Sequence, residues 1–337
     1  MGVQISDLLP KEKIDTKQLT GKKIAIDAFN WIYQFLSSIR QYDGTPLQDS
    51  KGRITSHLSG LFYRTANLIE NGVRPVYVFD GEPPKFKHGT TTIRKEIKEE
   101  AKRKWEEAVR EGNLEEAKKY AQQTSELTED MVKEGKELLE AMGVAVVQAK
   151  SEGEAQCAYL CKEGLVYSTA SQDADSLLFG SPLLIRNLNI TGKRKIRGKE
   201  IRIEPEMIKL ESLLKNLDIS RDQLIILGIL VGTDYNHGGI RGIGPKKALD
   251  LVKKFKTLGE VLKNVKWDFE VDAKEIFEFF KNPPVEKIKE IKFGKLNETE
   301  IKRILCDKHD FSEQRVDNVL KKISSPPQSS ISSFLGS

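Results

Sequence analysis

Short apolar runs alternate with helical segments along the first two-thirds of the chain. Five of these runs have the length and composition of buried strands: residues 22–27, 75–79, 144–147, 165–170 and 183–185. Three stretches between or after them are long and apolar enough to be helices that pack on a core: residues 31–39, 56–70 and 224–231. Because strands that alternate with helices form layered structures, the pattern predicts an α/β sandwich with a mostly parallel central sheet.

Acidic residues follow the predicted strands. Seven of them stand where an apolar strand or helix ends: Asp27, Asp80, Glu152, Glu154, Asp173, Asp175 and Asp234. In a parallel sheet, ligands bind beyond the carboxyl ends of the strands, so we expect the first six carboxylates to share one rim, with Asp234 as a seventh candidate. Like charges repel and half-buried carboxylates lose hydration, and divalent cations would offset both costs. Oxygen ligands suit Mg²⁺ or Mn²⁺, and seven acids are enough for two such ions.

Helix capping is the alternative interpretation of the paired acids. Asp173 could cap a helix while Asp175 is merely solvated, and Ser151 with Glu154 could form a capping box. Each capping role explains one acid of a pair and leaves the other without an explanation.

The composition changes between residues 85 and 140, where Lys, Arg and Glu dominate and apolar residues are sparse. The segment predicts helices of weak amphipathicity that would not pack a core by themselves. It could be a solvated excursion held by ion pairs along its helices, or a mobile cap over a site. Its place directly after Asp80 favours the cap.

A glycine-rich run reads GGIRGIGPKKA at residues 238–248 and resembles a helix–hairpin–helix element. Its glycines allow close approach of the backbone, and N–H groups at the start of a helix can hold a phosphate. Pro245 fits the first position of that helix, and Lys246 and Lys247 add positive charge. Such contacts would follow the shape of a DNA backbone rather than its sequence. A plain turn before a helix is the alternative.

Composition narrows the class of protein only slightly. The chain has 337 residues, a formal net charge of +5 and a pI near 8.8, so its total charge points only weakly to nucleic acid. Its three cysteines form no disulfide framework, and its histidines and cysteines lack zinc-site spacing, which favours a reducing interior and core thiols. No apolar stretch reaches about 18 residues and no signal-peptide core is present, so we expect no membrane span and no secretion.

Taken in order, these motifs resemble the flap structure-specific endonucleases of the XPG type, in the 5′-nuclease superfamily, and specifically their archaeal members. The resemblance is carried by IDA at 26–28, VFDGEPP at 78–84, EGEA at 152–155, SQDAD at 171–175 and GTDYN at 232–236, with the helix–hairpin–helix run after them. It implies a PIN-like α-β-α sandwich with a helical arch. It also implies a Mg²⁺-dependent nuclease with two metal ions per subunit, for which Mn²⁺ can substitute.

The function implied by the resemblance is the cleavage of 5′ flaps at single-strand/double-strand junctions of branched DNA, with associated 5′→3′ exonuclease activity. Such enzymes mature Okazaki fragments and act in DNA repair. We accordingly expect a monomer when free, in the cytoplasm of a prokaryote and associated with the nucleoid.

The resemblance also assigns roles to individual residues. The seven acids become the metal ligands. Lys87 and Arg94 match two basic residues at the base of the arch that act on the scissile phosphate. Their spacing of seven would place them on nearly one face of a single helix, although the threonines at 90–92 could start that helix late.

Further matches concern contacts with DNA. Tyr33 matches an aromatic on which a base at the flap junction stacks, with a half-buried core tyrosine as the alternative. Gly2, after removal of Met1, would place a free amino terminus near the site. Arg40 and Arg64 match basic positions that face DNA. In the helix–hairpin–helix, the downstream duplex and a K⁺ ion would be bound around Gly242, Gly244, Lys246 and Lys247.

By this resemblance the chain divides into five regions. They are a nuclease region at 1–105, the arch at 85–140, an internal nuclease region at 141–260 with the helix–hairpin–helix at 225–255, a helical region at 261–323, and a tail at 324–337 that we expect to be disordered alone. The tail resembles a sliding-clamp (PCNA) binding motif. Its anchors are Gln328, Ile331, Phe334 and Leu335, and one helical turn would place the three apolar ones on one face. Leu335 stands where the usual motif has a second aromatic.

Two other functions share part of these features. A PIN-type ribonuclease would have the same acid rim, but the arch and the helix–hairpin–helix speak against it. A non-catalytic scaffold that binds junctions and is recruited by the clamp would have no need of seven acids.

Overall fold

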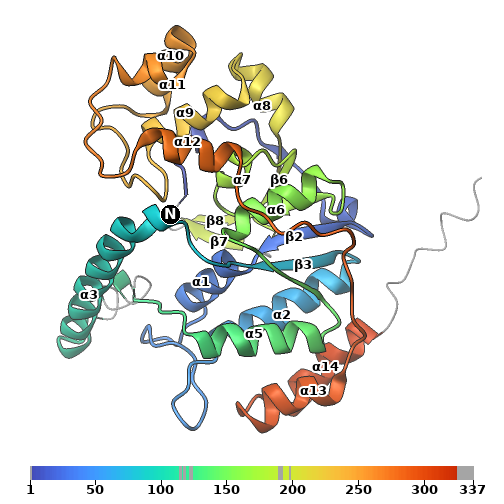
Figure 1. Ribbon diagram of the computed structural model, residues 1–337. Coiled ribbons are helices and arrows are strands. Elements are labelled where there is room, and N and C mark those ends of the chain that lie inside the picture. Colours follow the sequence, from blue (N-terminus) through green and yellow to red (C-terminus); the bar gives the residue numbers. More distant parts are fainter. Residues whose placement is uncertain are drawn as a thin grey trace, which may run out of the picture.

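A seven-stranded sheet forms the centre of the molecule (Figure 1). The computed structural model describes residues 2–113, 116, 119, 120, 124–188, 193–196 and 199–324, and only the backbone of 88–97, 109, 193–196 and 199–202. The strands are β1 (Glu12–Lys13), β9 (Glu206–Lys209), β6 (Leu183–Arg186), β5 (Ser168–Ala170), β2 (Lys23–Asp27), β3 (Arg74–Phe79) and β4 (Ala145–Gln148), in their order across the sheet. The five strands from β6 to β4 run parallel to one another. At the edge, β9 pairs antiparallel with β6, and β1 pairs antiparallel with β9. The predicted mostly parallel sheet is therefore confirmed.

The chain changes direction across the sheet between β2 and β5. From β2 it moves outward to β3 and then β4, and it later returns to β5 on the other side of β2 before continuing to β6. Asp27, at the end of β2, pairs with Val78 of β3, while Ile26 pairs with Ala170 of β5. Connections that leave in opposite directions open a crevice at the carboxyl ends of the two strands. The predicted acid rim lies at this end of the sheet.

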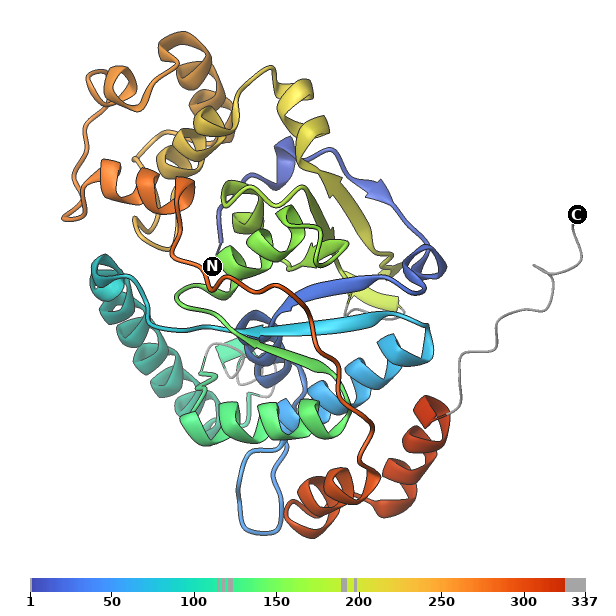
Figure 2. The ribbon, with the colours of Figure 1, turned by 45° about the vertical axis from the view of Figure 1, so that its right-hand side comes forward.

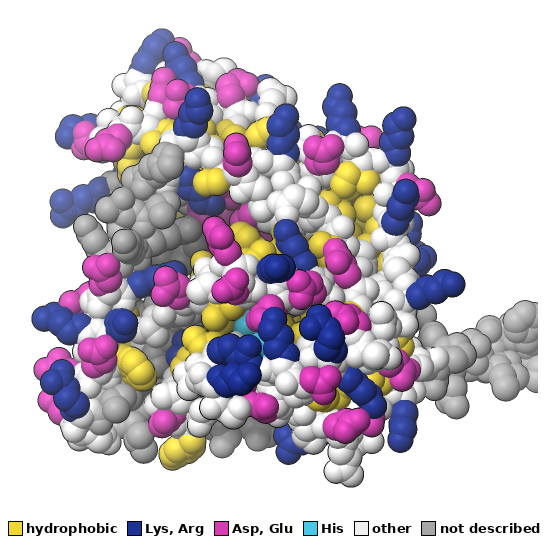
Figure 3. All heavy atoms as spheres, turned by 60° about the horizontal axis from the view of Figure 1, so that its bottom comes forward, with side chains coloured by type: hydrophobic (Ala, Val, Ile, Leu, Met, Phe, Trp, Pro, Cys, Tyr) yellow, Lys and Arg dark blue, Asp and Glu magenta, His cyan; other side chains and the backbone are white. Residues whose placement is uncertain are grey.

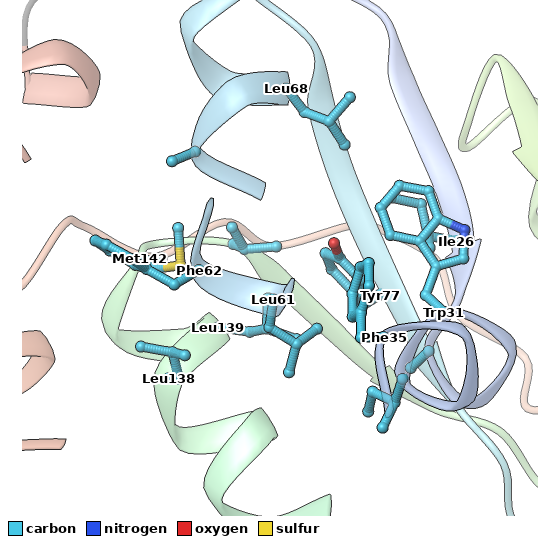
Figure 4. Close-up of a cluster of buried hydrophobic side chains, with 14 of the residues drawn as sticks. Ile26, Trp31, Phe35, Leu61, Phe62, Leu68, Tyr77, Leu138, Leu139 and Met142 are labelled. Carbon is cyan, nitrogen blue, oxygen red and sulfur yellow. The ribbon is translucent and has the colours of Figure 1, made fainter. Parts of the chain in front are cut away.

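The two faces of the sheet have separate cores, because successive strand residues point to opposite sides. Ile26 and Tyr77 face α1 (Ala28–Ser38), α2 (Ser56–Glu70) and α5 (Glu129–Ala141). Figure 4 shows this cluster, in which the ring of Trp31 meets that of Tyr77 edge-on at 5.8 Å. Ala25 and Val78 face α6 (Gly153–Lys162), where Cys157 and Cys161 are buried free thiols, as expected.

A second group of helices packs beside the sheet. It consists of α7 (Asp175–Leu178), α8 (Leu210–Leu217), α9 (Arg221–Val231), α10 (Pro245–Phe255), α11 (Leu258–Leu262) and α12 (Ala273–Lys281). Both α10 and α12 pack on α9, whose apolar residues are buried on all sides. A capping box at Ser220 and Gln223 fixes the start of α9.

An extended strap, residues 282–297, crosses the molecule from α12 to α13 (Figure 2). The prediction of a helical region at 261–323 is wrong for this segment, because Pro283 and Pro284 cannot sustain a helix. The buried Gln156 of α6 replaces the missing backbone partners: its Nε2 donates to Glu286 O (2.9 Å), and Glu286 N donates to its Oε1 (2.7 Å). The strap leads to α13 (Glu298–Lys302), the π-helical turn η4 (Arg303–Asp307) and α14 (Glu313–Ser324), which packs on α2.

The charged segment after β3 begins with a 3₁₀ turn, η3 (Lys85–Lys87), and continues as the long helix α3 (His88–Arg110). Figures 1 and 2 show α3 projecting from the rest of the molecule. The remaining described elements are the 3₁₀ turns η1 (Ser6–Leu8) and η2 (Thr16–Leu19) and a hairpin of β7 (Lys193–Ile196) and β8 (Lys199–Arg202). None of the helices in the described part of the chain is both long and apolar enough to cross a membrane.

A buried ionic network joins three distant segments on the lower face, where Figure 3 shows Lys and Arg side chains around a histidine. Glu134 of α5 accepts from Lys308 (2.6 Å) and lies 3.2 Å from the Nε2 of His309. The other nitrogen of His309 lies 2.9 Å from Asp49, in the loop before α2. His57 of α2 adds a contact of 3.8 Å to Glu134. The network therefore holds the loop before α2 and the turn between η4 and α14 against α5.

Glu134→Gln should make the unfolding free energy less dependent on pH in the acidic range. The neighbouring His57 first, and Lys308 after it, lower the pKa of Glu134 from 4.5 to about 2 against the effect of burial. A carboxylate with a depressed pKa stabilises the fold above its unfolded pKa and loses this effect as the pH falls toward the folded value. We expect this group to account for on the order of 1–2 kcal/mol of unfolding free energy lost between about pH 5 and pH 3, allowing for partial exposure.

Urea unfolding at the two pH values measures this contribution, with Glu140→Gln at an exposed position of the same helix as the matched control. The control should keep the wild-type dependence. If Glu134→Gln keeps it too, the network does not stabilise the ionised carboxylate.

Candidate active site

The carboxyl ends of the central strands bring the predicted acids together. Asp27 ends β2 and Asp80 follows β3, while Glu152 and Glu154 stand at the start of α6, after β4. The turn after β5 contains Asp173 and Asp175, and Asp234 follows α9. Elements separated by up to about two hundred residues in sequence thus place all seven acids in one region.

Several of these acids are close enough for the charge of one to raise the pKa of another. Burial raises the pKa of Asp27 to about 6, and repulsion from Asp173 and Glu152 adds to the shift. Burial and then the charges of Asp234 and Asp173 raise the pKa of Asp175 to about 8. The pKa values of Asp80 and Glu154 are raised well above the ordinary range, first by burial and then by neighbouring acids. Repulsion among carboxylates that are removed from water is relieved when cations bind beside them.

Each of the buried acids is oriented by a donor from elsewhere in the chain. Asn30 donates through its backbone N–H to Asp27 (3.0 Å) and through its side-chain amide to Asp173 (2.9 Å). Three further bonds run from Gly153 N to Asp80 (2.8 Å), from Ser171 Oγ to Glu154 (3.0 Å) and from Val3 N to Asp175 (2.7 Å). The sequence analysis did not identify Asn30, Ser171 and Val3 as donors. Asn30 N donates to the N-cap residue Asp27 within one turn, but the bonds of Asn30 to Asp173, of Ser171 to Glu154 and of Val3 to Asp175 join separate elements.

The donor set fits hard divalent cations. Carboxylate oxygens suit Mg²⁺ or Mn²⁺ and not zinc or copper. The bonds just described use one oxygen of each of the five acids named there. Among the described residues, however, no three His, Cys, Asp or Glu side chains are already arranged to hold an ion. The fold therefore gathers the acids, while protein donors hold them in this conformation.

The capping interpretation of the paired acids is wrong. Helix α7 has Ala174 as its N-cap and no side-chain cap bond, so Asp173 does not cap it. Helix α6 has Glu152 at the N-cap position, again without a side-chain bond, and no capping box joins Ser151 to Glu154. The carbonyl of Ser151 instead accepts from Gly81 N (2.7 Å), which links the ends of β3 and β4. The one cap in the cluster is Asp27, which accepts from Asn30 N at the start of α1.

Lys87 is the cation that the fold places among the acids. Its Nζ donates to both carboxylate oxygens of Glu152 at 2.8 Å. Burial lowers the pKa of Lys87, but Glu152 and the charges of Asp80 and Asp234 outweigh it, so that the pKa is raised overall. The prediction that one helix carries Lys87 and Arg94 is wrong, because Lys87 ends η3 and α3 begins at His88. A late helix start at 90–92 is also wrong, and the side chain of Arg94 lies outside the described residues.

Gly2 lies against the turn that carries Asp173 and Asp175. A Cβ atom at Gly2 would stand 2.4 Å from the Cβ of Asp173 and 2.9 Å from a carboxylate oxygen of Asp175. Only glycine fits here while Val3 keeps its bond to Asp175.

The other predicted basic and aromatic residues lie on α1, at its end, and on α2. Tyr33 keeps 39% of its surface exposed, has Lys98 of α3 5.1 Å from its ring centre, and is outside the hydrophobic clusters. Arg40 is half-buried and donates to Gly44 O and Ser125 Oγ, both at 2.9 Å. Arg64 of α2 is partly exposed.

The glycine-rich run connects α9 to α10 in the predicted way. Gly242 has a positive φ of 80°, Gly244 is the N-cap of α10, and Pro245 is its first residue. Lys246 and Lys247 are exposed at that helix start.

The loop between α9 and α10 also fixes Asp234. Asn236 accepts from the N–H (3.2 Å) and the hydroxyl (2.7 Å) of Thr233 and donates to Ile229 O (2.7 Å). These two residues, which the sequence analysis did not single out, hold the loop on either side of the acid.

Comparison with known proteins gives consistent matches over the whole chain. The family described as the XPG N-terminal domain matches residues 1–101, and the XPG I-region matches residues 143–234. The chain is 55% identical over 342 residues to "Flap endonuclease 1" of Thermococcus onnurineus, covering 100% of this chain and 99% of that protein.

Two solved structures have the same fold. The flap endonuclease-1 from Methanococcus jannaschii superposes with a TM-score of 0.76 at 43% identity, over 96% of this chain and 98% of that one. The catalytic core of Rad2 in complex with DNA substrate does so with a TM-score of 0.71 at 25% identity, over 95% and 97%.

Gly2→Ala tests the close packing of the first residues against the acids. The added methyl group must displace the Asp173 side chain or the Val3–Asp175 bond, and overpacking of this kind costs about 1–3 kcal/mol. We expect the unfolding free energy to fall by on the order of 1–2 kcal/mol in urea. Gly259→Ala, in α11 with open space around it, is the control and should be neutral or slightly stabilising. Unchanged stability of Gly2→Ala would contradict the packing.

Proposed function

The chain belongs to the archaeal flap structure-specific endonucleases of the XPG family, and on this basis we propose which of its residues carry the reaction. It is a phosphodiester hydrolase that cleaves 5′ flaps at single-strand/double-strand DNA junctions, with 5′→3′ exonuclease activity, in Okazaki fragment maturation and DNA repair. Enzymes of this family use divalent metal ions. Identity of 55% over the whole chain sets aside a PIN-type ribonuclease and a non-catalytic scaffold.

The acid cluster is the observation on which the assignment of residues rests. We propose that its seven carboxylates hold two Mg²⁺ ions per subunit, for which Mn²⁺ can substitute: Asp27, Asp80, Glu152, Glu154, Asp173, Asp175 and Asp234. When bound, such a pair of ions stabilises negative charge on the attacking and leaving oxygens of a phosphodiester. The raised pKa values of Asp27 and Asp175 support this role, because burial and neighbouring negative charge both disfavour an uncompensated carboxylate there.

Lys87 would act on the scissile phosphate. Its ammonium stays protonated at neutral pH, since the surrounding acids raise its pKa. A donor held in a partly buried place can stabilise developing negative charge without reorganisation. Arg94 would share this task from the first turns of α3, a role that rests on the family match alone.

Branched DNA would meet three parts of the protein. Tyr33 has an exposed ring on which a base at the junction can stack, with Arg40 and Arg64 facing the DNA near it. Gly2 would hold the amino terminus close to the acids. The downstream duplex would lie on the start of α10, where Gly242 and Gly244 leave the backbone accessible and Lys246 and Lys247 supply charge. We place a K⁺ ion there as well.

The tail would bind the sliding clamp PCNA. Its anchors Gln328, Ile331, Phe334 and Leu335 lie outside the described residues, after α14 ends at Ser324. The apolar anchors fit a groove-binding helical turn. We propose that the enzyme is monomeric when free and meets the clamp through this segment.

Asp173→Ala should lower cleavage of a double-flap substrate in Mg²⁺ by at least ~10³-fold, because charge stabilisation on both sides of the phosphate is lost. Single-turnover rates measure this effect, and Mn²⁺ titration of the protein without DNA reports the loss of ion binding directly. Asp130→Ala, at an exposed acid of α5, is the matched control and should cleave normally. Equal rates for Asp173→Ala and wild type would remove the proposed role of Asp173.

Deletion of residues 328–337 should leave basal cleavage intact and abolish stimulation by the clamp. The deleted segment is remote in sequence from every acid of the site. Cleavage rates with and without the clamp measure both effects. Undiminished stimulation of the truncated protein would refute the role of the tail.

A further inference from the structure

Five aromatic rings form a cluster beside the acids, between η3 and α12. Phe86 meets Tyr235 edge-on at 5.3 Å and Phe279 at 5.5 Å between ring centres. Tyr235 in turn meets Phe279 at 5.3 Å and Phe280 at 5.5 Å, and Phe179 lies 4.7 Å from Phe280. Aromatic pairs of this kind add about 0.5–1.5 kcal/mol each beyond the burial of their area, so the contacts favour one mutual arrangement of the five rings.

Three of these rings are next in sequence to elements of the proposed site. Phe86 directly precedes Lys87, Tyr235 directly follows Asp234, and Phe179 directly follows α7, the helix that begins at Asp175. The cluster therefore connects the base of the arch, the Asp234 loop and the Asp173–Asp175 turn. Through Phe279 and Phe280 it also connects them to α12, which packs on α9 at the helix–hairpin–helix.

Phe86 differs from the other four rings in its position. The others are at most 9% exposed and belong to the folded body, while Phe86 is partly exposed and belongs to the segment that becomes the arch. Lys87 follows it in a tight turn in which Lys87 N donates to Pro84 O (2.9 Å). In a turn held in this way, the place of the Phe86 ring also fixes where the Lys87 side chain begins.

We propose that Phe86 is a positioning residue for Lys87. By docking its ring on Tyr235 and Phe279, it sets the base of the arch so that the ammonium of Lys87 stands at the acids. This inference rests on the proposed role of Lys87. It adds to that role a physical link between the arch and α12. The five rings would then fix the position of Lys87 relative to DNA bound at the helix–hairpin–helix.

Loss of the ring should slow the chemical step more than it weakens binding. Phe86→Ala leaves the base of the arch without its contact, and a misplacement of about 1 Å at a reacting group can reduce a rate by roughly 10²-fold. We expect single-turnover cleavage of a double flap to slow by on the order of 10- to 100-fold, with the Kd for the same DNA within about threefold of wild type. Phe86→Leu, which keeps an apolar side chain, should recover most of the rate.

The decisive comparison repeats the substitution in a protein without Lys87. If Phe86 acts by placing Lys87, then Phe86→Ala should cost the Lys87→Ala protein less than about threefold, because interacting residues are non-additive. Phe277→Ala is the matched control: it removes a partly buried ring from α12 that lies outside the five-ring cluster, and it should cleave at nearly the wild-type rate. Thermal unfolding of every variant accompanies the rates.

The outcomes separate this inference from the proposed function. If Lys87→Ala cleaves normally, the proposed role of Lys87 is wrong, whatever Phe86 does. If Lys87→Ala is slow while Phe86→Ala is fast, or if Phe86→Ala slows both backgrounds by the same factor, the positioning role is refuted. If Phe86→Ala unfolds, the cleavage rates of Phe86→Leu and Phe86→Met are compared in its place, each with and without Lys87. Rates that differ between these variants only when Lys87 is present support the proposal. Rates that change by the same factor with and without Lys87 overturn it.

Discussion

Repulsion among buried carboxylates is the constraint on which the rest of this structure depends. Burial, and after it the charges of neighbouring acids, raises the pKa of Asp27, Asp80, Glu154 and Asp175, and that of Asp175 reaches about 8. A fold can hold such a group only if donors and cations are supplied around it. The backbone N–H groups of Asn30, Gly153 and Val3 supply part of this, and Lys87 supplies a positive charge at 2.8 Å from Glu152.

The topology of the sheet explains why the acids meet where they do. Parallel strands end at the same edge, and the reversal between β2 and β5 opens that edge into a crevice. Close backbone approaches then bring donors within reach. The N–H of Gly153 can donate to Asp80 at 2.8 Å because glycine has no Cβ atom, which would stand 2.5 Å from that carboxylate. Under the proposed assignment, a rim built in this way would hold the divalent ions that enzymes of this family use.

Contacts between remote segments keep the two halves of the site in register. The strap at 282–297, held by the amide of Gln156, ties the helix that carries Glu152 and Glu154 to the segment that follows α12. The five-ring cluster ties α12 to the Asp234 loop and to the turn before Lys87. The proposed DNA contact at α10 and the region of the acids therefore belong to one connected body, while α3 projects from it.

The sequence by itself predicted the five parallel strands, the helices α1, α2 and α9 and the places of the seven acids after strands or helices, because apolar runs and the acids that follow them are local patterns. It did not predict β1 and β9, which depend on pairing between distant segments. It could not determine what surrounds the acids. Asn30 and Asp173 are 143 positions apart, and Val3 and Asp175 are 172 apart, so no spacing relates them. It misjudged the cap of α6 and the helix start at Lys87, where tertiary contacts outweigh local propensity. Only the tertiary structure decided that Lys87 stands against Glu152 and that Phe86 docks on Tyr235, since both contacts depend on how separate elements pack.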